Sequence, residues 1–152
     1  MTKLIQVPTK VLTQRHPFSQ LDRCLTDTPQ AHYTRMQRIK GKKLATKEEL
    51  YRRVRLGRDY LARHWQRPVL MQEVAQESSL SQFHFQRTFS AVFGISPARF
   101  ACLVKIKKAH DLLRSGQYNV KQVAVKLGYA DGFSFSKAFK REVGVAPCCF
   151  LR

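Results

Sequence analysis

The residue types that usually carry catalysis or bind metals are few in this chain and widely spaced. Cys24, Cys102, Cys148 and Cys149 form no C-x-x-C pair, and no two of the five histidines lie four residues apart. The chain has no G-x-S-x-G motif and no glycine-rich phosphate loop, and its ten acidic residues supply few general acids or bases. We therefore expect no enzyme activity, no metal site and no cofactor.

The charge points to a phosphate-bearing partner. The 152 residues include 28 Lys and Arg against 10 Asp and Glu, a formal net charge of +18. Such a field attracts the phosphates of nucleic acid or of an anionic membrane surface, although a solvated basic surface is the simpler alternative. A hydrophobic content of 43% is enough for a core, and no apolar run approaches the roughly 18 residues of a membrane span. No secretion signal is recognised in residues 1–10, so we expect a cytoplasmic protein with no membrane contact.

One segment carries side chains that can read base edges. If a helix begins after Ser81, its apolar stripe holds Phe85 and Phe89, and its outer face carries Gln82, Phe83, Gln86, Arg87 and Ser90. In a major groove, glutamine pairs with adenine, arginine pairs with guanine, and an aromatic ring packs on a thymine methyl. Two alternatives stay open: Phe83 packs against a neighbouring helix, and Arg87 contacts only a phosphate.

Caps and stops predict the elements that would position this face. Thr46 to Glu49 has the form of a capping box, which predicts a helix from there to about residue 64. A short helix over about 70–77, with Leu70, Val74 and Ala75 inward, then precedes the helix that Ser81 caps, a helix-turn-helix order. Ser96 and a proline at the next position begin a further helix, which should run to about residue 114.

An internal repeat duplicates this unit. Five residues recur with the same type at an offset of 50 positions. The first set is Phe85, Phe89, Gly94, Pro97 and Phe100, and the second is Phe135, Phe139, Gly144, Pro147 and Phe150. Asn119 with Gln122, and Asp131, are the predicted caps of the second pair of helices. The helix between the units would span roughly 27 Å, which suits two major grooves about 34 Å apart on one side of DNA.

Residues 48–152 resemble the DNA-binding domain of the AraC/XylS transcription regulators. The resemblance is carried by residues 124–131 (AVKLGYAD), 135–140 (FSKAFK) and 144–147 (GVAP). It implies an all-α fold in residues 46–152, a seven-helix bundle of two helix-turn-helix subdomains joined by a long linker helix. Because 45 preceding residues are too few for the ligand-binding barrel of longer members, the resemblance is to the stand-alone members of the family.

The resemblance also implies which positions contact DNA. The base-contacting positions of the first unit fall on Phe83, Gln86 and Arg87, and the repeat offset adds Gly132, Phe133, Ser136 and Lys137, with Ser134 beside them. Because glycine and serine discriminate bases weakly, we expect the second unit to act more through phosphate and shape contacts. Candidate phosphate ligands, for each of which a solvated charge is the alternative, are Arg99, Lys105, Lys121, Lys126, Lys140 and Arg141.

Residues 1–45 are interpreted as a basic N-terminal arm, irregular or partly disordered, because prolines interrupt any long periodicity. The arm ends in a cluster that could add non-specific DNA affinity: Arg35, Arg38, Lys40, Lys42 and Lys43. A loosely packed extension, or a small partner-binding strand over residues 4–7, are the alternatives.

The sequence thus predicts a sequence-specific DNA-binding transcription regulator. The resemblance implies an activator that contacts RNA polymerase. Because both repeats lie in one chain, we expect a monomer that reads an asymmetric site in two successive major grooves. One alternative is an interaction protein of the same fold, which binds a partner regulator or the polymerase rather than its own operator. A non-specific basic nucleic-acid binder is the other.

Overall fold

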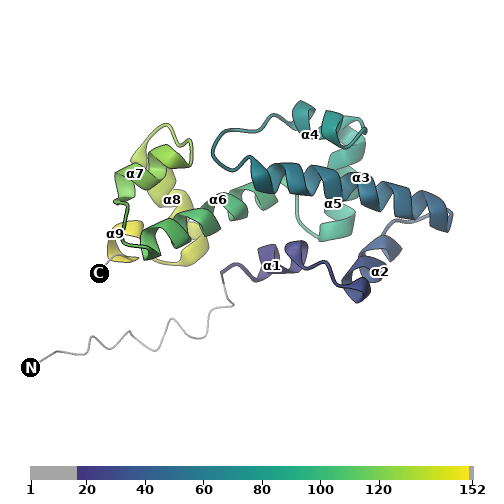
Figure 1. The fold of residues 1–152 in the computed structure, drawn as a ribbon, viewed down its shortest axis with the longest axis horizontal. Helices are drawn as coiled ribbons and strands as arrows, with labels where there is room; N and C mark the ends of the chain where they lie inside the picture. Colours follow the sequence, from purple (N-terminus) through teal and green to yellow (C-terminus); the bar gives the residue numbers. More distant parts are fainter. Residues whose placement is uncertain (1–16, 151–152) are drawn as a thin grey trace, which may run out of the picture.

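The computed structural model describes residues 17–150, and all the regular structure in that range is helical (Figure 1). Nine helices lie in it: α1 (Ser19–Leu25), α2 (Pro29–Gln37), α3 (Leu44–Arg63), α4 (Met71–Glu77), α5 (Gln82–Phe93), α6 (Pro97–Arg114), α7 (Val120–Lys126), α8 (Gly132–Val143) and α9 (Pro147–Phe150). An all-α fold is therefore confirmed.

Helices α5, α7 and α8 begin at the caps that the sequence predicts, and α5 and α8 end at the predicted glycines. Ser81 accepts a hydrogen bond from the backbone of the third residue of α5, and Asp131 does the same for α8. Both helices end at a glycine in the left-handed region, Gly94 with φ 75° and Gly144 with φ 89°. Asn119 and Gln122 form the predicted reciprocal capping box of α7.

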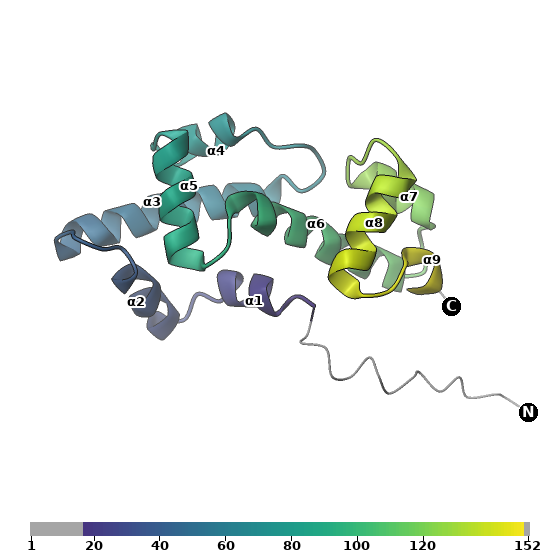
Figure 2. The same ribbon diagram turned by 180° about the vertical axis from the view of Figure 1, so that it is seen from behind.

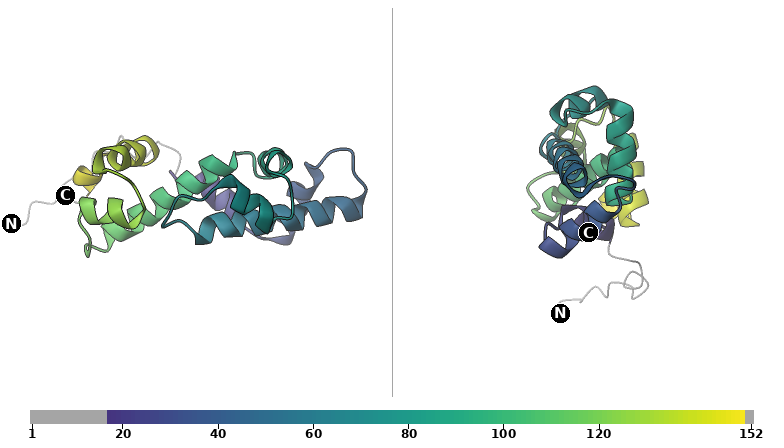
Figure 3. Two further views of the ribbon diagram at one scale, coloured as in Figure 1. Left: turned by 90° about the horizontal axis from the view of Figure 1, so that it is seen from above. Right: turned by 90° about the vertical axis from the view of Figure 1, so that its right-hand side faces the viewer.

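The core is one continuous apolar cluster through which α6 runs. Phe85 and Phe89 from the first repeat, and Phe135 and Phe139 from the second, are all fully buried. The left-hand view of Figure 3 shows α6 as the bridge between α3 to α5 at one end and α7 to α9 at the other. The long linker helix therefore holds the two repeats within one structure.

Two helices lie within residues 1–45, so the prediction of an irregular arm is wrong over Ser19–Leu25 and Pro29–Gln37. Pro29 is the first residue of α2, where its fixed φ and missing N–H are favourable, and Thr28 caps the helix. Phe18 and Leu21 are almost completely buried in the common core. The expected seven helices correspond to α3 to α9, and α1 and α2 are additional. The strand considered for residues 4–7 lies outside the described residues.

Two local predictions in the first repeat are also wrong. Helix α3 begins at Leu44 with no side-chain cap, and Glu49 pairs with arginines of its own helix instead of completing a box with Thr46. Leu70, expected to point inward, is 64% exposed, whereas Val74 and Ala75 are buried as predicted.

Within residues 17–150, no single helix is long and apolar enough to cross a membrane. Only α5 and α6 taken together meet the length and composition criteria, and they are bent by 63° at their junction.

Candidate nucleic-acid interface

Two equivalent helix-turn-helix units, α4–α5 and α7–α8, present their second helices on the same side of the molecule. Figure 2 shows α5 in front of α3 and α8 in front of α6. The turns are closed by matching backbone hydrogen bonds, from Leu80 N to Ala75 O at 3.0 Å and from Tyr129 N to Ala124 O at 3.1 Å. Each turn contains one residue with positive φ, Ser79 in the first and Gly128 in the second. The sequence repeat is therefore a repeat of structure.

The outer face of α5 is free for an external partner. Gln82, Phe83, Gln86 and Arg87 are exposed, and none of their side chains makes a hydrogen bond or ion pair among the described residues. Phe83 is 74% exposed, so the alternative that it packs against a neighbouring helix is wrong. Ser90, one helical turn further on, is half-buried at the edge of this face.

The outer face of α8 is equally open but carries less base-reading chemistry. Phe133 is 79% exposed, and Lys137 and Lys140 are exposed with no polar partner among the described residues. A Cβ atom added at Gly132 would meet no atom within 4 Å, so a side chain is absent there although there is space for one to begin.

The two serines of this helix are less available. Ser134 is exposed, but its amide donates to Asp131 at 2.6 Å and its hydroxyl donates to the same carboxylate at 2.8 Å. These bonds lower the pKa of Asp131 and commit Ser134 to the helix cap. Ser136 is half-buried.

Three of the six candidate phosphate ligands have side-chain hydrogen bonds inside the protein. Arg99 and Arg141 both donate to Glu142, whose side chain is only 4% exposed. Burial alone would raise the pKa of Glu142, but the two guanidinium groups hold it below its usual value. Lys105 donates to Leu127 O at 3.1 Å, and burial lowers its pKa. These cations brace α8 and the second turn against α6.

The described acidic residues are distributed unevenly over the surface. Arginines of α3 and its C-terminal end are paired with carboxylates: Arg52 and Arg53 with Glu49, Arg55 and Arg58 with Asp27, Arg63 with Glu77, and Arg67 with Glu73. Hydrogen bonds from Arg52 and Arg53 lower the pKa of Glu49 to about 2. By contrast, Arg87, Lys137 and Lys140 on the outer faces of α5 and α8 have no acidic partner among the described residues. Uncompensated positive charge is therefore present on the face that α5 and α8 share.

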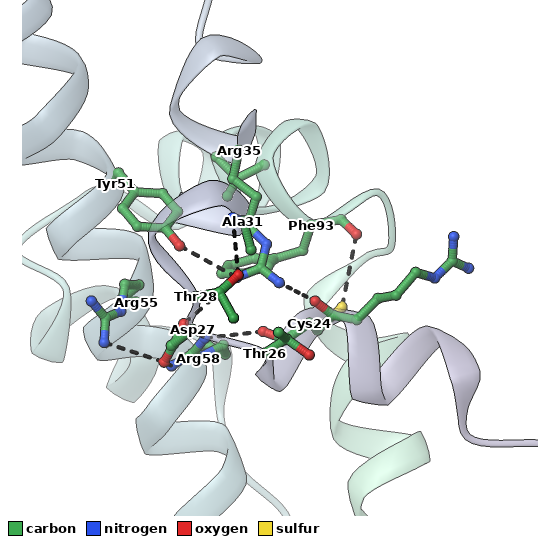
Figure 4. Close-up of polar contacts among 12 residues, drawn as sticks. Cys24, Thr26, Asp27, Thr28, Ala31, Arg35, Tyr51, Arg55, Arg58 and Phe93 are labelled. Atoms are coloured by element: carbon green, nitrogen blue, oxygen red, sulfur yellow. Dashed lines mark hydrogen bonds and ion pairs between the residues drawn. The ribbon is translucent and has the colours of Figure 1, made fainter. Parts of the chain in front are cut away.

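A buried arginine network, which the sequence did not reveal, fixes α1 and α2 on α3 (Figure 4). Arg58, 3% exposed, makes two hydrogen bonds of 2.8 Å to the Asp27 carboxylate and one of 3.0 Å to Cys24 O. Arg35, 6% exposed, donates to the Tyr51 hydroxyl at 3.4 Å. The hydrogen bond from Arg58, with the surrounding positive charge, lowers the pKa of Asp27.

Gly57 fixes the depth at which the first helix-turn-helix unit packs on α3. A Cβ atom there would lie 2.3 Å from Phe85 Cε2 and 2.5 Å from Ser78 Oγ. The helices approach so closely that only glycine fits, and Phe85 belongs to α5 itself.

Tandem helix-turn-helix units with exposed second helices on one basic face define a DNA-binding protein of the helix-turn-helix class. A family model described as a helix-turn-helix domain matches residues 74–152, more than half of the chain. The chain belongs to the AraC family of helix-turn-helix proteins, which confirms the resemblance inferred from its motifs.

Relatives and solved structures agree with this assignment. The chain is 30% identical over 91 residues to the MmsAB operon regulatory protein of Pseudomonas aeruginosa, a match covering 60% of this chain and 30% of that protein. It is 32% identical over 88 residues to the transcriptional activator RhaS of Klebsiella pneumoniae, covering 58% and 32%. A probable AraC family transcriptional regulator from Rhodopseudomonas palustris has 25% identity and a TM-score of 0.61, over 66% of this chain and 94% of that one. The match to the curated relatives spans only about a third of their length.

Proposed function

We propose that this protein is a sequence-specific DNA-binding regulator of transcription that reads an asymmetric site with α5 and α8. The observation that carries the proposal is the pair of exposed outer faces of α5 and α8 on one side of the molecule. The side chains of Gln86, Arg87, Lys137 and Lys140 on these faces make no hydrogen bond or ion pair with any described residue. Family membership makes DNA the expected ligand of those faces.

The first unit supplies most of the base discrimination. Arg87 can donate two hydrogen bonds to a guanine and Gln86 can pair with an adenine, and each good bidentate pair is worth about 1–3 kcal/mol of discrimination. Phe83, on the same face, packs on a thymine methyl group or on the sugar backbone. In this proposal Gln82 and Ser90 contact DNA at the two ends of the same face.

The second unit supplies phosphate and shape contacts. Lys137 and Lys140 are placed to bind phosphates, and Phe133 offers an apolar surface to the groove. The positions of Gly132, Ser134 and Ser136 offer little hydrogen bonding to bases. Arg99 contributes indirectly, because its ion pair with Glu142 holds α8 in place on α6.

The linker helix sets the spacing of the site. The 18 residues of α6 are roughly 27 Å long, close to the distance of about 34 Å between successive major grooves. Because both units belong to one chain, a monomer can occupy two successive grooves and needs no palindrome. The activator RhaS among its relatives favours positive regulation, and we infer a cytoplasmic activator that contacts RNA polymerase.

Selection of bound sequences from a random DNA pool at about 150 mM salt tests the proposal, because the non-specific electrostatic contribution is already weakened there. We expect an asymmetric motif that spans about two helical turns. A true regulator binds its site roughly 10³ to 10⁷ times more tightly than random DNA. If no motif emerges, the protein is instead an interaction protein of the same fold or a non-specific basic binder.

A further inference from the structure

The loop between α2 and α3, residues 38–43, concentrates cations that have no acidic partner. We call these residues the basic loop. Lys40, Lys42 and Lys43 are exposed, and their side chains make no hydrogen bond or ion pair with any described residue. The arginines of the following helix α3, by contrast, are paired with carboxylates. The loop therefore differs from the neighbouring helix in having lysines without acidic partners.

The basic loop is held in a fixed place beside α5. Arg38 Nη1 donates to Val92 O of α5 at 2.9 Å, and Ile39 is 6% exposed in the common core. A groove of about 400 Å³ lies between the loop and the helix, lined on the loop side by Arg38, Lys40 and Lys42 and on the helix side by His84 and Arg87. Arg87 is thus shared between the groove and the outer face of α5.

We propose that the basic loop is a third DNA contact, which binds backbone phosphates at the edge of the major groove that α5 enters. The inference rests on the proposed function and extends it. A helix in a major groove about 12 Å wide is bounded by a phosphate strand on each side, so cations beside the helix meet that strand. Contacts of this kind fix register and add affinity, but they read no bases.

The second unit has no such contact, which makes the interface asymmetric. In the repeat, α6 takes the place of α3, and the segment before α6 contains only Gly94, Ile95 and Ser96. None of these residues is charged. The basic loop should therefore protect DNA backbone from cleavage only at the end of the site that α5 occupies.

The test compares the full chain with a variant in which the three lysines are replaced, Lys40→Gln, Lys42→Gln and Lys43→Gln. Each lost phosphate contact reduces the slope of log K against log salt by about 0.9, so three lost contacts reduce it by about 2.7. Extrapolated from 1 M to 0.15 M salt, this corresponds to a loss of affinity on the order of 100-fold. Hydroxyl-radical footprinting should show protection lost beyond the α5 half of the site and kept at the α8 half.

A matched control removes paired cations from α3. The double variant Arg52→Gln and Arg63→Gln removes two exposed charges that already have acidic partners. It should keep most of the salt slope, because only uncompensated cations near the DNA release counterions. Thermal unfolding verifies that the variants fold. Each single lysine variant should reduce the slope of log K against log salt by about a third of the reduction in the triple variant.

The possible outcomes separate this inference from the proposed function. An unchanged salt slope in the triple lysine variant overturns the role of the basic loop, even if the protein selects a clear motif. Equal loss in the α3 control also overturns it, since the effect is then one of net charge. If the wild-type protein selects no motif, the proposed function fails, and the slope on a random duplex still decides whether the loop binds phosphates.

Discussion

Replacing Gly57 by alanine should destabilise the protein although alanine is the better helix former. The added Cβ would lie 2.3 Å from Phe85 Cε2, whereas carbon atoms in contact are normally about 3.5–4.0 Å apart. Phe85 is completely buried and cannot swing away. Overpacking of this kind costs about 1–3 kcal/mol, and the gain in helix propensity returns about 1 kcal/mol. Since the required shift exceeds 1 Å, we expect a net loss of about 1–2 kcal/mol.

Thermal and urea unfolding of the purified variant measure this loss. At about 2–4 °C per kcal/mol, Tm should fall by roughly 2–8 °C. The matched control is Gly132→Ala, a helical glycine whose new Cβ would meet no atom within 4 Å, and it should leave Tm unchanged or slightly raised. If Gly57→Ala unfolds at or above the wild-type temperature, the close packing of α3 against α5 has been misjudged.

Three further substitutions test the contacts that hold the units together. Asp27→Asn should cost about 2 kcal/mol, less than a fully buried pair because the carboxylate is 35% exposed. The hydrogen bond from Arg58 lowers the pKa of Asp27, so its stabilisation is complete above the ordinary value of 3.8 and is lost as pH falls through the lowered value. The unfolding free energy of this variant should therefore depend less on pH in the acid range than that of the wild-type protein. An identical pH dependence would contradict the pairing. Gly128 has φ of +70°, and a Cβ atom there would lie 2.8 Å from Gln66 O. In urea unfolding, Gly128→Ala should therefore lower the unfolding free energy by about 1–3 kcal/mol, and wild-type stability would count against the contact. Glu142→Gln removes a buried carboxylate shared by two arginines, and it should weaken binding at the α8 half of the site more than at the α5 half, as half-site titrations would reveal; equal loss would refute its bracing role.

The repeated units could be predicted because short-range signals define them. Ser81, Asp131 and the two terminal glycines act within a few residues of their own helices, and the buried phenylalanines follow helical spacing. The same signals predicted which positions of α5 and α8 face outward. The pattern agrees with the exposure of Gln82, Phe83, Gln86, Arg87, Phe133 and Lys137, whereas Ser90 and Ser136 are half-buried.

The N-terminal helices escape prediction because a proline can begin a helix as well as interrupt one. Thr28 and Pro29 make the same cap-and-proline start for α2 that Ser96 and Pro97 make for α6. Phe18 and Leu21, three residues apart, also carry a helical apolar spacing.

Other features depend on contacts between distant parts of the chain. Arg58 meets Asp27 across 31 residues, and Arg99 meets Glu142 across 43, so neither pair has a local signature. Arg99 therefore looks in sequence like any other surface cation. The location of the basic loop beside α5 is likewise set by tertiary packing, here through Arg38 and Val92 O.

Crossing protein variants with half-site mutations tests most directly whether α5 and α8 each contact their own half of one asymmetric site. Arg87→Ala and Lys137→Ala are each titrated against the selected site and against sites altered in one half. We predict that Arg87→Ala loses affinity and base preference only at the α5 half, by about 1–3 kcal/mol. Lys137→Ala should lower affinity for all sequences and reduce the salt slope by about 1. If Arg87→Ala loses base preference equally at both halves, or if neither variant changes binding, contact of each helix with its own half of the site is contradicted.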